Sequence, residues 1–388
     1  MKSAAADSCF MSHVLCCMSL VLYRKYRPKT FAEISGQKHI VETLVNAIKS
    51  GRVAHAYLFC GPRGTGKTTM ARLLAKALNC EKLLTFNFKL STDPIEPCNK
   101  CLSCQSINDG NALDIIEIDA ASNRGINEIR DLREGVKFSP AALKYKVFII
   151  DEVHMLTKEA FNALLKTLEE PPQHAIFILA TTEANKIPAT ILSRCQRFDF
   201  RKLSVNEIIE RLNGIIKKEG IDCGDDVVSF IATISDGGLR DAESLLGQII
   251  SVSSGKIDLE TVQDVLGIAD MRDVYAFVDL LINNNHQEIF KFINNLFNQG
   301  KDMAEFMRSS SNYLRKMMIC QIDNALVATV AKDMTREQQV NLCSQAQKFE
   351  NAKIHKIVAR LVDAENQIKK SFSPIIPIEL AMIDILGI

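Results

Sequence analysis

The sequence predicts an α/β domain built on a parallel sheet, followed by helical domains that continue to the end of the chain. Three observations predict it. Short apolar segments alternate with amphipathic ones up to about residue 200, a pattern typical of a parallel sheet covered by helices on both faces. A glycine-rich turn joins one of these strands to the helix after it. Strand signals then stop, and helical periodicity continues from there.

Each element of the α/β domain follows from its own pattern. Ile40, Leu44, Val45 and Ile48 recur at helical spacing, and Gly51 is a plausible residue to follow the helix that they form. In chain order we expect strands at 56–60, 113–119, 146–151 and 175–182, helices at 36–50, 67–80, 125–138 and 157–170, and an irregular segment at 81–112.

The second half of the chain reads as helical. Ser204 and Glu207 have the spacing of a capping box, and Gly220 marks a plausible end for the helix that starts there. Two further helices are expected near 224–235 and 238–254. From about residue 270 the pattern stays helical but carries no recognisable chemistry.

Composition excludes some functions. A net charge of +1 over 388 residues gives no global basic field, so contact with nucleic acid must be local or shared among subunits. No apolar run is long enough to span a bilayer, so we expect no membrane partner. Residues 1–17 make a poor secretory signal, and we expect a disordered tail there and a cytoplasmic protein. In that compartment the 12 cysteines are thiols or metal ligands rather than disulfides.

The glycine-rich turn, GPRGTGKT, matches the phosphate-loop pattern G-x-x-x-x-G-K-[ST] between a strand and a helix. In such a loop, backbone N–H groups and the helix N-terminus surround the phosphates. Lys67 is expected to reach the β- and γ-phosphates, and the Thr68 hydroxyl to bind Mg²⁺. A chance match in a glycine-rich turn is the alternative. The expected nucleotide-binding residues are Gly61, Pro62, Arg63, Gly64, Thr65, Gly66, Lys67 and Thr68.

Two acidic residues, Asp151 and Glu152, follow the buried strand 146–151. Ligands of open α/β sheets bind at the carboxyl ends of the strands, so Asp151 is placed to hold Mg²⁺. Glu152 is then the natural general base for an attacking water. The alternative for this pair alone is an exposed acidic turn. Together with the phosphate loop, the pair indicates hydrolysis of ATP rather than transfer of phosphate to a small molecule.

The order of the motifs GPRGTGKT, DEVHML, LATT and SRC resembles that of AAA+ ATPases of the clamp-loader group. The segments YRPKTFAEISGQ, EIDAASN, FNALLKTLEEPP, ILSRCQRF and GGLRDAESLL are similar to those of the gamma/tau subunits of bacterial DNA polymerase III. The resemblance is dense over residues 18–270 and thin over 270–388. Because the chain ends just after the third domain of that family, it resembles the short, gamma-like form.

The resemblance implies roles for two residues outside the phosphate loop. Arg194, in the SRC motif, resembles the arginine finger that reaches the nucleotide of a neighbouring subunit, where a guanidinium stabilises charge on the γ-phosphate. Its alternative is a surface arginine that caps a helix. Thr182 aligns with the sensor that positions the attacking water, and Thr181 is the runner-up.

Arg240 resembles the arginine of the lid that senses the γ-phosphate from within the same chain. A surface salt bridge to Asp241 or Glu243 is the competing interpretation.

The resemblance also implies a domain plan and partners. Residues 18–200 would form the AAA+ ATPase domain, 201–269 a helical lid, and 270–388 a collar that holds several subunits in a pentamer. Its other members would be copies of this chain, delta and delta-prime. Together they would load the sliding clamp onto primer-template DNA during DNA replication, driven by ATP binding and hydrolysis. The rivals are another DNA-remodelling AAA+ ATPase, such as a Holliday-junction motor, or a non-hydrolysing scaffold like delta-prime.

The resemblance implies that the helix near Gly125 points its N-terminus towards the DNA, where its backbone N–H groups can bind phosphates. Arg124 and Arg130 are candidate helpers. Pairing of these arginines with Glu128 or Glu134 is the alternative. No feature of this segment is suited to reading bases, so we expect recognition of duplex shape.

Cys98, Cys101 and Cys104 lie within PCNKCLSC and lack one ligand for a tetrahedral metal site. A disulfide is disfavoured by the compartment, and a redox pair by the absence of a thioredoxin-like context. We expect Cys80 to be the fourth ligand of a structural Zn²⁺ in an insertion spanning 80–104. Cys60 is the competing ligand, although its place in a buried strand favours a packing role.

Overall fold

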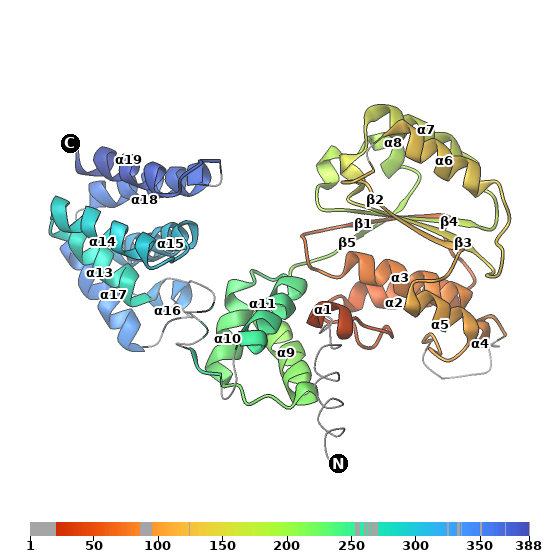
Figure 1. Ribbon diagram of the computed structural model, residues 1–388, viewed down its shortest axis with the longest axis horizontal. Coiled ribbons are helices and arrows are strands. Elements are labelled where there is room, and N and C mark those ends of the chain that lie inside the picture. Colours follow the sequence, from red (N-terminus) through yellow and green to blue (C-terminus); the bar gives the residue numbers. More distant parts are fainter. Residues whose placement is uncertain are drawn as a thin grey trace, which may run out of the picture. The chain divides into compact units, whose positions relative to one another are not determined.

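The computed structural model describes residues 21–85, 95–123, 125–252, 257–259, 262, 265, 271–323, 326–331, 334, 336–349, 351–368 and 370–387. The chain forms two compact units, Met1–Ile257 and Asp258–Ile388 (Figure 1). The boundary that the sequence suggested between lid and third domain, 269/270, stays a proposal.

A five-stranded sheet in the order β2-β3-β4-β1-β5 organises the first unit, and every pairing in it is parallel. This confirms the α/β class expected from the alternating pattern. The strands are β1 Ala56–Cys60, β2 Ile115–Asp119, β3 Lys146–Asp151, β4 Ala175–Thr181 and β5 Gln196–Asp199. The central strands β1 and β4 are buried along their whole length, while the edge strands β2 and β5 are partly exposed.

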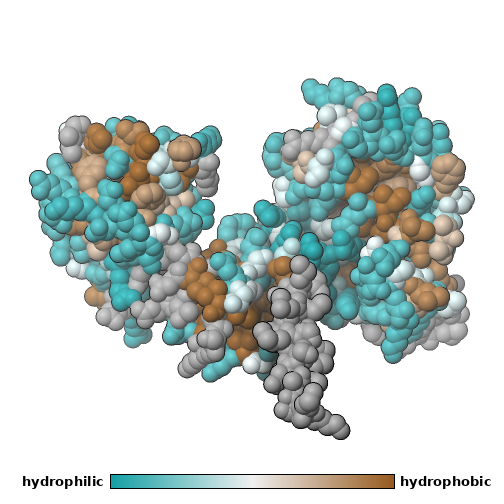
Figure 2. All heavy atoms as spheres, viewed as in Figure 1, coloured by the Kyte–Doolittle hydropathy of each residue, from teal (hydrophilic) through white to brown (hydrophobic). Residues whose placement is uncertain are grey.

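Helices cover both faces of this sheet (Figure 1). One face carries α2 Lys38–Lys49, α3 Lys67–Asn79, α4 Glu81–Leu84 and α5 Leu102–Asp109, and the other carries α6 Ile126–Val136, α7 Lys158–Glu169 and α8 Ala189–Leu192. Two apolar cores result, one on each face. In Figure 2 hydrophobic residues emerge at the level of the sheet, between the polar outer sides of the two helical layers. Short elements complete this part: α1 Leu22–Lys25, η1 Val153–Met155 and η2 Ala184–Lys186.

Two expectations for this unit were wrong. The segment 81–112 is not wholly irregular, because it contains α4 and α5. The sheet also has a strand that the sequence did not reveal, β5, since 175–182 was the last strand expected before the strand signals stop near residue 200. In β5 only Phe198 is buried, so an edge strand of four residues shows almost no apolar pattern.

The lid follows β5 and consists of α9 Val205–Glu219, α10 Asp225–Ile234 and α11 Leu239–Val252. The predicted capping box is present: the Glu207 N–H donates to the Ser204 hydroxyl, and the Glu207 carboxylate accepts from the Ser204 N–H. Hydrogen bonding to Arg201 lowers the pKa of Glu207 to about 2. The carboxylate therefore stays charged at the N-terminus of α9, where the helix dipole favours it.

The described part of the second unit is helical, as expected. Its helices are α13 Met271–Ile282, α14 His286–Asn298, α15 Met303–Ile322, α16 Val327–Val330, α17 Arg336–Lys348, α18 Asn351–Ile368 and α19 Ile375–Leu386. They enclose a single apolar core in which Phe277 and Phe306 pack edge to face. None of the described helices in either unit combines the length and apolarity needed to cross a membrane.

Candidate nucleotide and metal sites

The topology brings the predicted catalytic residues together at one edge of the sheet. Strands β1, β4 and β3 are neighbours, and all run in the same direction. The phosphate loop follows β1, Thr182 follows β4, and Asp151 ends β3. A cavity at this edge is lined by Lys67, Thr68, Asp151, Glu152 and Arg240, among others. Sequence reasoning assigned these five residues to one site, and the structure places them in one cavity.

At two positions of the phosphate loop the backbone passes so close to neighbouring backbone that only glycine fits without strain. Gly61 has φ +148°, and a Cβ there would lie 2.4 Å from the carbonyl oxygen of Phe200. Gly64 has φ +76°, and its Cβ would lie 3.2 Å from the Cα of Gly238 in the lid. The loop is therefore packed against the end of the sheet on one side and against the lid on the other.

Lys67 is buried at the start of α3. Its Nζ donates to the carbonyl oxygens of Gly61 and Pro62, both at 2.7 Å. Burial lowers the pKa of Lys67, although the nearby charges of Glu152 and Asp151 act in the opposite direction. The ammonium group thus lies within the loop, bonded to neutral oxygens, and can gain a stronger partner when a phosphate arrives.

Thr68 and Asp151 are in direct contact: the Thr68 hydroxyl donates to Asp151 Oδ2 at 2.6 Å. The two residues are 83 positions apart in the sequence. A hydroxyl and a carboxylate are hard oxygen donors, the type that Mg²⁺ prefers. The residues present therefore fit a magnesium site beside the phosphate loop.

Glu152 is held in a left-handed backbone conformation, with φ +47°, which is uncommon for a residue other than glycine. The Thr182 hydroxyl donates to Glu152 Oε2 at 3.0 Å. Thr181, in contrast, is fully buried, and its hydroxyl lies 3.0 Å from Nδ1 of His154. Of the two threonines, Thr182 is therefore the one that contacts the candidate base.

The lid contacts the phosphate loop through its backbone. The N–H groups of Leu239 and Arg240 both point to the carbonyl oxygen of Gly64, at 3.1 and 3.4 Å. The Arg240 guanidinium lies over the ring of Tyr23, 4.5 Å from its centre. Glu243, offered as an alternative partner of Arg240, is buried and pairs instead with Arg211 at 3.0 Å. Burial raises the pKa of this carboxyl despite the paired guanidinium.

Sequence reasoning missed part of the lining of this cavity. The additional lining residues there are Tyr23, Arg27, Pro28, Ile34 and Ser35. They lie in and around the YRPKTFAEIS segment, which was noted as a family motif but given no role. Packing of this N-terminal segment against the lid was not predictable from local pattern. Arg211 of α9 donates to the carbonyl oxygen of Tyr26, 185 residues away.

Arg194 is not among the described residues that line this cavity. It follows α8, and its Nη2 forms an ion pair with Glu169 Oε1 at 2.6 Å. Its Nη1 donates to the carbonyl oxygen of Thr190 at 2.7 Å. The guanidinium thus has a defined orientation, held by two partners of its own chain that do not line the cavity either.

The candidate DNA contacts lie at the N-terminus of α6. Arg130 is exposed on this helix, and Arg124 lies outside the described residues. The helix begins after Gly125, as the sequence suggested.

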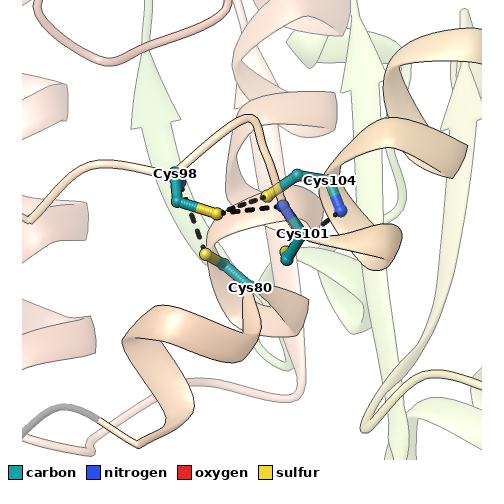
Figure 3. Close-up of side chains that lie close together, drawn as sticks. All are labelled: Cys80, Cys98, Cys101 and Cys104. Carbon is teal, nitrogen blue, oxygen red and sulfur yellow. Dashed lines mark hydrogen bonds between the residues drawn. The ribbon is translucent and has the colours of Figure 1, made fainter.

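The structure places the sulfur atoms of Cys80, Cys98, Cys101 and Cys104 within 4.8 Å of one another (Figure 3). Cys80 follows the last residue of α3, and Cys101 is the N-cap of α5. A tetrahedral Zn²⁺ with bonds of about 2.3 Å to sulfur separates its ligands by about 3.8 Å, so small adjustments suffice. Cys60, the competing ligand, is not in this group; it is buried at the end of β1.

Backbone N–H groups are directed at three of the sulfurs. Cys80 accepts from the N–H of Cys98, Cys98 from that of Cys101, and Cys101 from that of Cys104, each at 3.4 Å. Burial acts to raise the pKa of Cys98, but the N–H groups of Lys100 and Cys101 and the neighbouring thiols lower it to about 6. Burial raises the pKa of Cys80 and of Cys104. A cation that binds thiolates would offset that cost, so the donor set fits a closed metal site.

Comparisons with known proteins place the chain in a family. The model described as DNA polymerase III, delta subunit matches residues 36–204, and that of the clamp loader subunit ATPase lid domain matches 207–255. The model of domain III of subunits gamma and tau matches 257–387. The gamma subunit of Buchnera aphidicola subsp. Acyrthosiphon pisum is 35% identical over 367 residues, which cover 95% of this chain and 98% of that subunit.

The chain belongs to the gamma/tau family of DNA polymerase III subunits. Another member, the tau subunit of Bacillus subtilis, is 42% identical over 94% of this chain, but the match spans only 62% of the tau subunit. The tau subunit of Escherichia coli is 41% identical over 79% of this chain and 46% of its own length. The chain thus spans about half to two thirds of these longer relatives.

Solved structures resemble this gamma/tau chain more distantly. The Holliday junction branch migration motor RuvB of Thermotoga maritima has a TM-score of 0.46 and 22% identity, over 71% of this chain and 86% of RuvB. The clamp loader delta protein of Bacillus subtilis has a TM-score of 0.34 and 15% identity, over 89% and 99%. Both likenesses are too distant to bear on function.

Proposed function

We propose that this gamma/tau chain is the ATP-hydrolysing motor subunit of a bacterial clamp loader, which uses ATP to load the sliding clamp onto primer-template DNA. The observation that carries this proposal is the convergence of Lys67, Thr68, Asp151, Glu152 and Arg240 on one cavity in a member of this family. A scaffold subunit that does not hydrolyse ATP would have no need for the acidic pair beside the phosphate loop.

The phosphate loop binds the triphosphate. Lys67 releases the carbonyl oxygens of Gly61 and Pro62 and binds the β- and γ-phosphates, because a charge-assisted bond to phosphate is stronger than one to a neutral carbonyl. Thr68 and Asp151 would hold Mg²⁺, which neutralises charge on the phosphate oxygens when bound. The backbone N–H groups at the start of α3 add their dipole.

Replacing Lys67 with alanine is expected to weaken MgATP binding by about 100-fold or more, because each bond from a charged donor contributes roughly 1.5–3 kcal/mol. The affinity of the isolated subunit for a fluorescent ATP analogue measures this. Lys49→Ala, at the exposed end of α2, is the matched control and should bind normally. An unchanged affinity of the Lys67 variant would refute the assignment of the phosphate loop.

Glu152 acts as the general base in hydrolysis. It accepts a proton from water as the water oxygen bonds to the γ-phosphorus, and the bond from that phosphorus to the bridging oxygen breaks with its electron pair leaving on ADP. The Thr182 hydroxyl, at 3.0 Å from Glu152, orients the carboxylate and the water. Arg240 leaves the ring of Tyr23 to reach the γ-phosphate as the lid closes. At the opposite end, Arg27, Pro28, Ile34 and Ser35 hold the base and sugar.

Assembly supplies the last catalytic group. Arg194 does not line the described nucleotide cavity of its own chain, which suits an arginine finger that serves a neighbouring subunit. The neighbours would be copies of this chain, delta and delta-prime in a pentamer. The DNA backbone would be held by the N-terminus of α6 with help from Arg130, and binding should weaken as salt rises.

The test of this function is ATP turnover by the purified chain, first alone and then with delta, delta-prime, the sliding clamp and primed DNA. The motor function requires turnover that rises when clamp and DNA are added together. A chain that binds partners but gives no turnover under any of these conditions would be a scaffold. Stimulation by four-way DNA junctions, without a response to the clamp, would favour the branch-migration alternative.

Zinc would be held by Cys80, Cys98, Cys101 and Cys104, and it supplies a rigid, closed link between α3 and the start of α5. We expect the wild-type chain to hold about one zinc atom and Cys101→Ser to lose it. The variant keeps only three of the four thiolate ligands, which is too few for a closed tetrahedral site. Elemental analysis of purified protein measures it. The control is Cys60→Ser, which should keep the metal. If zinc were lost from Cys60→Ser and retained by Cys101→Ser, the metal ligands would have to include Cys60 at the end of β1.

A further inference from the structure

The cavity is lined in part by a short loop, residues 27–35, which the proposed function assigns to the base and sugar and which is here called the base-end loop. Arg27 and Pro28 at its start and Ile34 and Ser35 at its end line the cavity. Its middle residues do not face the cavity but contact another part of the chain. That part is the cysteine module, defined here as Cys80 together with residues 95–109.

The carboxylate of Glu96, two residues before Cys98, binds the middle of the base-end loop with both oxygens. The N–H of Phe31 donates to Oε2 at 2.6 Å, and the N–H of Ala32 donates to Oε1 at 2.8 Å. Two successive backbone donors on one ionised carboxylate make charge-assisted bonds, which are among the stronger hydrogen bonds in proteins. They fix the direction of the loop at this point.

A second tie runs through Lys76, which is buried on α3. Its Nζ donates to the carbonyl oxygen of Lys29 at 2.8 Å, to Asn99 Oδ1 at 2.6 Å and to Asn108 Oδ1 at 2.8 Å. The amide of Asn99 also donates to the Lys29 carbonyl at 3.1 Å. Asn99 lies between two of the cysteines and has φ +56°, so the path of the chain around the metal ligands sets where this amide points.

Apolar packing joins the same two segments. Phe31 of the base-end loop and Ile95, Cys80 and Cys104 of the module belong to one buried cluster, against which Ile34 also packs. Contacts therefore reach from the cysteines to a residue that lines the cavity itself. A module that merely stapled an insertion to α3 would need no hydrogen bonds to this loop.

We propose that the cysteine module sets the affinity of the nucleotide site: with its metal bound, it holds the base-end loop in place through Glu96, Asn99 and Lys76, which are positioning residues for ATP. This inference rests on the proposed nucleotide and zinc sites. Because the loop contacts the base end and not the γ-phosphate, the module affects how tightly nucleotide binds, not how fast bound ATP is cleaved.

The test compares Glu96→Ala with wild type and with Glu81→Ala, a matched carboxylate whose side chain contacts Ser103 inside the module. Binding of MgADP to the isolated chain is measured by calorimetry, zinc by elemental analysis, and ATP turnover in the assembled loader. We expect MgADP affinity to fall about tenfold in Glu96→Ala, with zinc content and kcat at saturating ATP unchanged, since two charge-assisted bonds are lost. Glu81→Ala should match wild type, and Glu96→Gln should lie between.

Two further variants test the inference independently of Glu96→Ala. Asn99→Ala keeps all four thiols and should also weaken MgADP binding, while Cys101→Ser should lose both zinc and affinity. Normal MgADP affinity in Glu96→Ala or in zinc-free Cys101→Ser would overturn the inference, as would a fall in kcat with no change in affinity. A wild-type chain that binds zinc but no nucleotide would instead overturn the proposed function.

Discussion

Arg194→Ala is expected to lower clamp- and DNA-stimulated ATP turnover by roughly 10³-fold, the scale of an arginine finger, while the isolated subunit binds ATP normally. The structure supports both halves of this expectation. Arg194 is absent from the described lining of the nucleotide cavity, so its loss leaves the subunit's own site intact. Its guanidinium is held by Glu169 and the Thr190 carbonyl, and it would be presented to an adjacent γ-phosphate in the assembly.

Two measurements separate this role from a structural one. ATP affinity is measured on the isolated chain and turnover on the assembled loader, with Arg197→Ala as the control. Arg197 lies on β5, is exposed and pairs with Asp199, so its removal should change turnover little. If the isolated Arg194 variant failed to bind ATP, the role across a subunit interface would be wrong.

Glu152→Gln is expected to lower turnover by roughly 10²–10⁴-fold, the usual contribution of a general base, without loss of ATP binding. Glutamine keeps the shape and the hydrogen bond from Thr182 but cannot take a proton from water. The variant should therefore hold ATP and trap the clamp on the loader. Pre-steady-state phosphate release and clamp retention would measure the two effects.

Glu183→Gln is the control for that experiment, because this carboxylate is nearby but exposed and pairs with Lys186. It should turn over ATP at close to the normal rate. Equal losses in both variants would mean that the acidic character of this region matters rather than one proton acceptor. If the Glu152 variant failed to bind ATP, Glu152 would be a residue that binds the nucleotide rather than the general base.

The parts of the fold that could be predicted are those whose pattern is local. The bounds of β1 and β3 coincide with the expected strands 56–60 and 146–151, because the buried part of each strand is a continuous apolar run. The capping box at Ser204 was equally readable, since its two partners are three residues apart. The phosphate loop was predictable for the same reason. The spacing of its glycines shows where the backbone must pass close to other backbone or to a phosphate.

The rest depended on contacts between distant parts of the chain. The edge strand β5 is paired on one side only and has a single buried residue, so its period-two pattern is too short to detect. Part of the cavity lining comes from residues 23–35, a segment that is held in place by Arg211 and Glu96 from other parts of the chain. The sequence pattern within residues 23–35 gives no indication of these distant partners. Cys80 was found because metal ligands must come in a set of four, a constraint on number rather than on local pattern.

The left-handed backbone conformation of Glu152 has a cost in stability. A side chain in this region costs about 1–2 kcal/mol relative to glycine, which adopts it freely. Glycine at position 152 would relieve this strain, but it would also remove the carboxylate that accepts the hydrogen bond from Thr182. In the mechanism proposed above this carboxylate takes the proton from water, so the strained backbone at this position is a cost in stability that accompanies the proposed turnover.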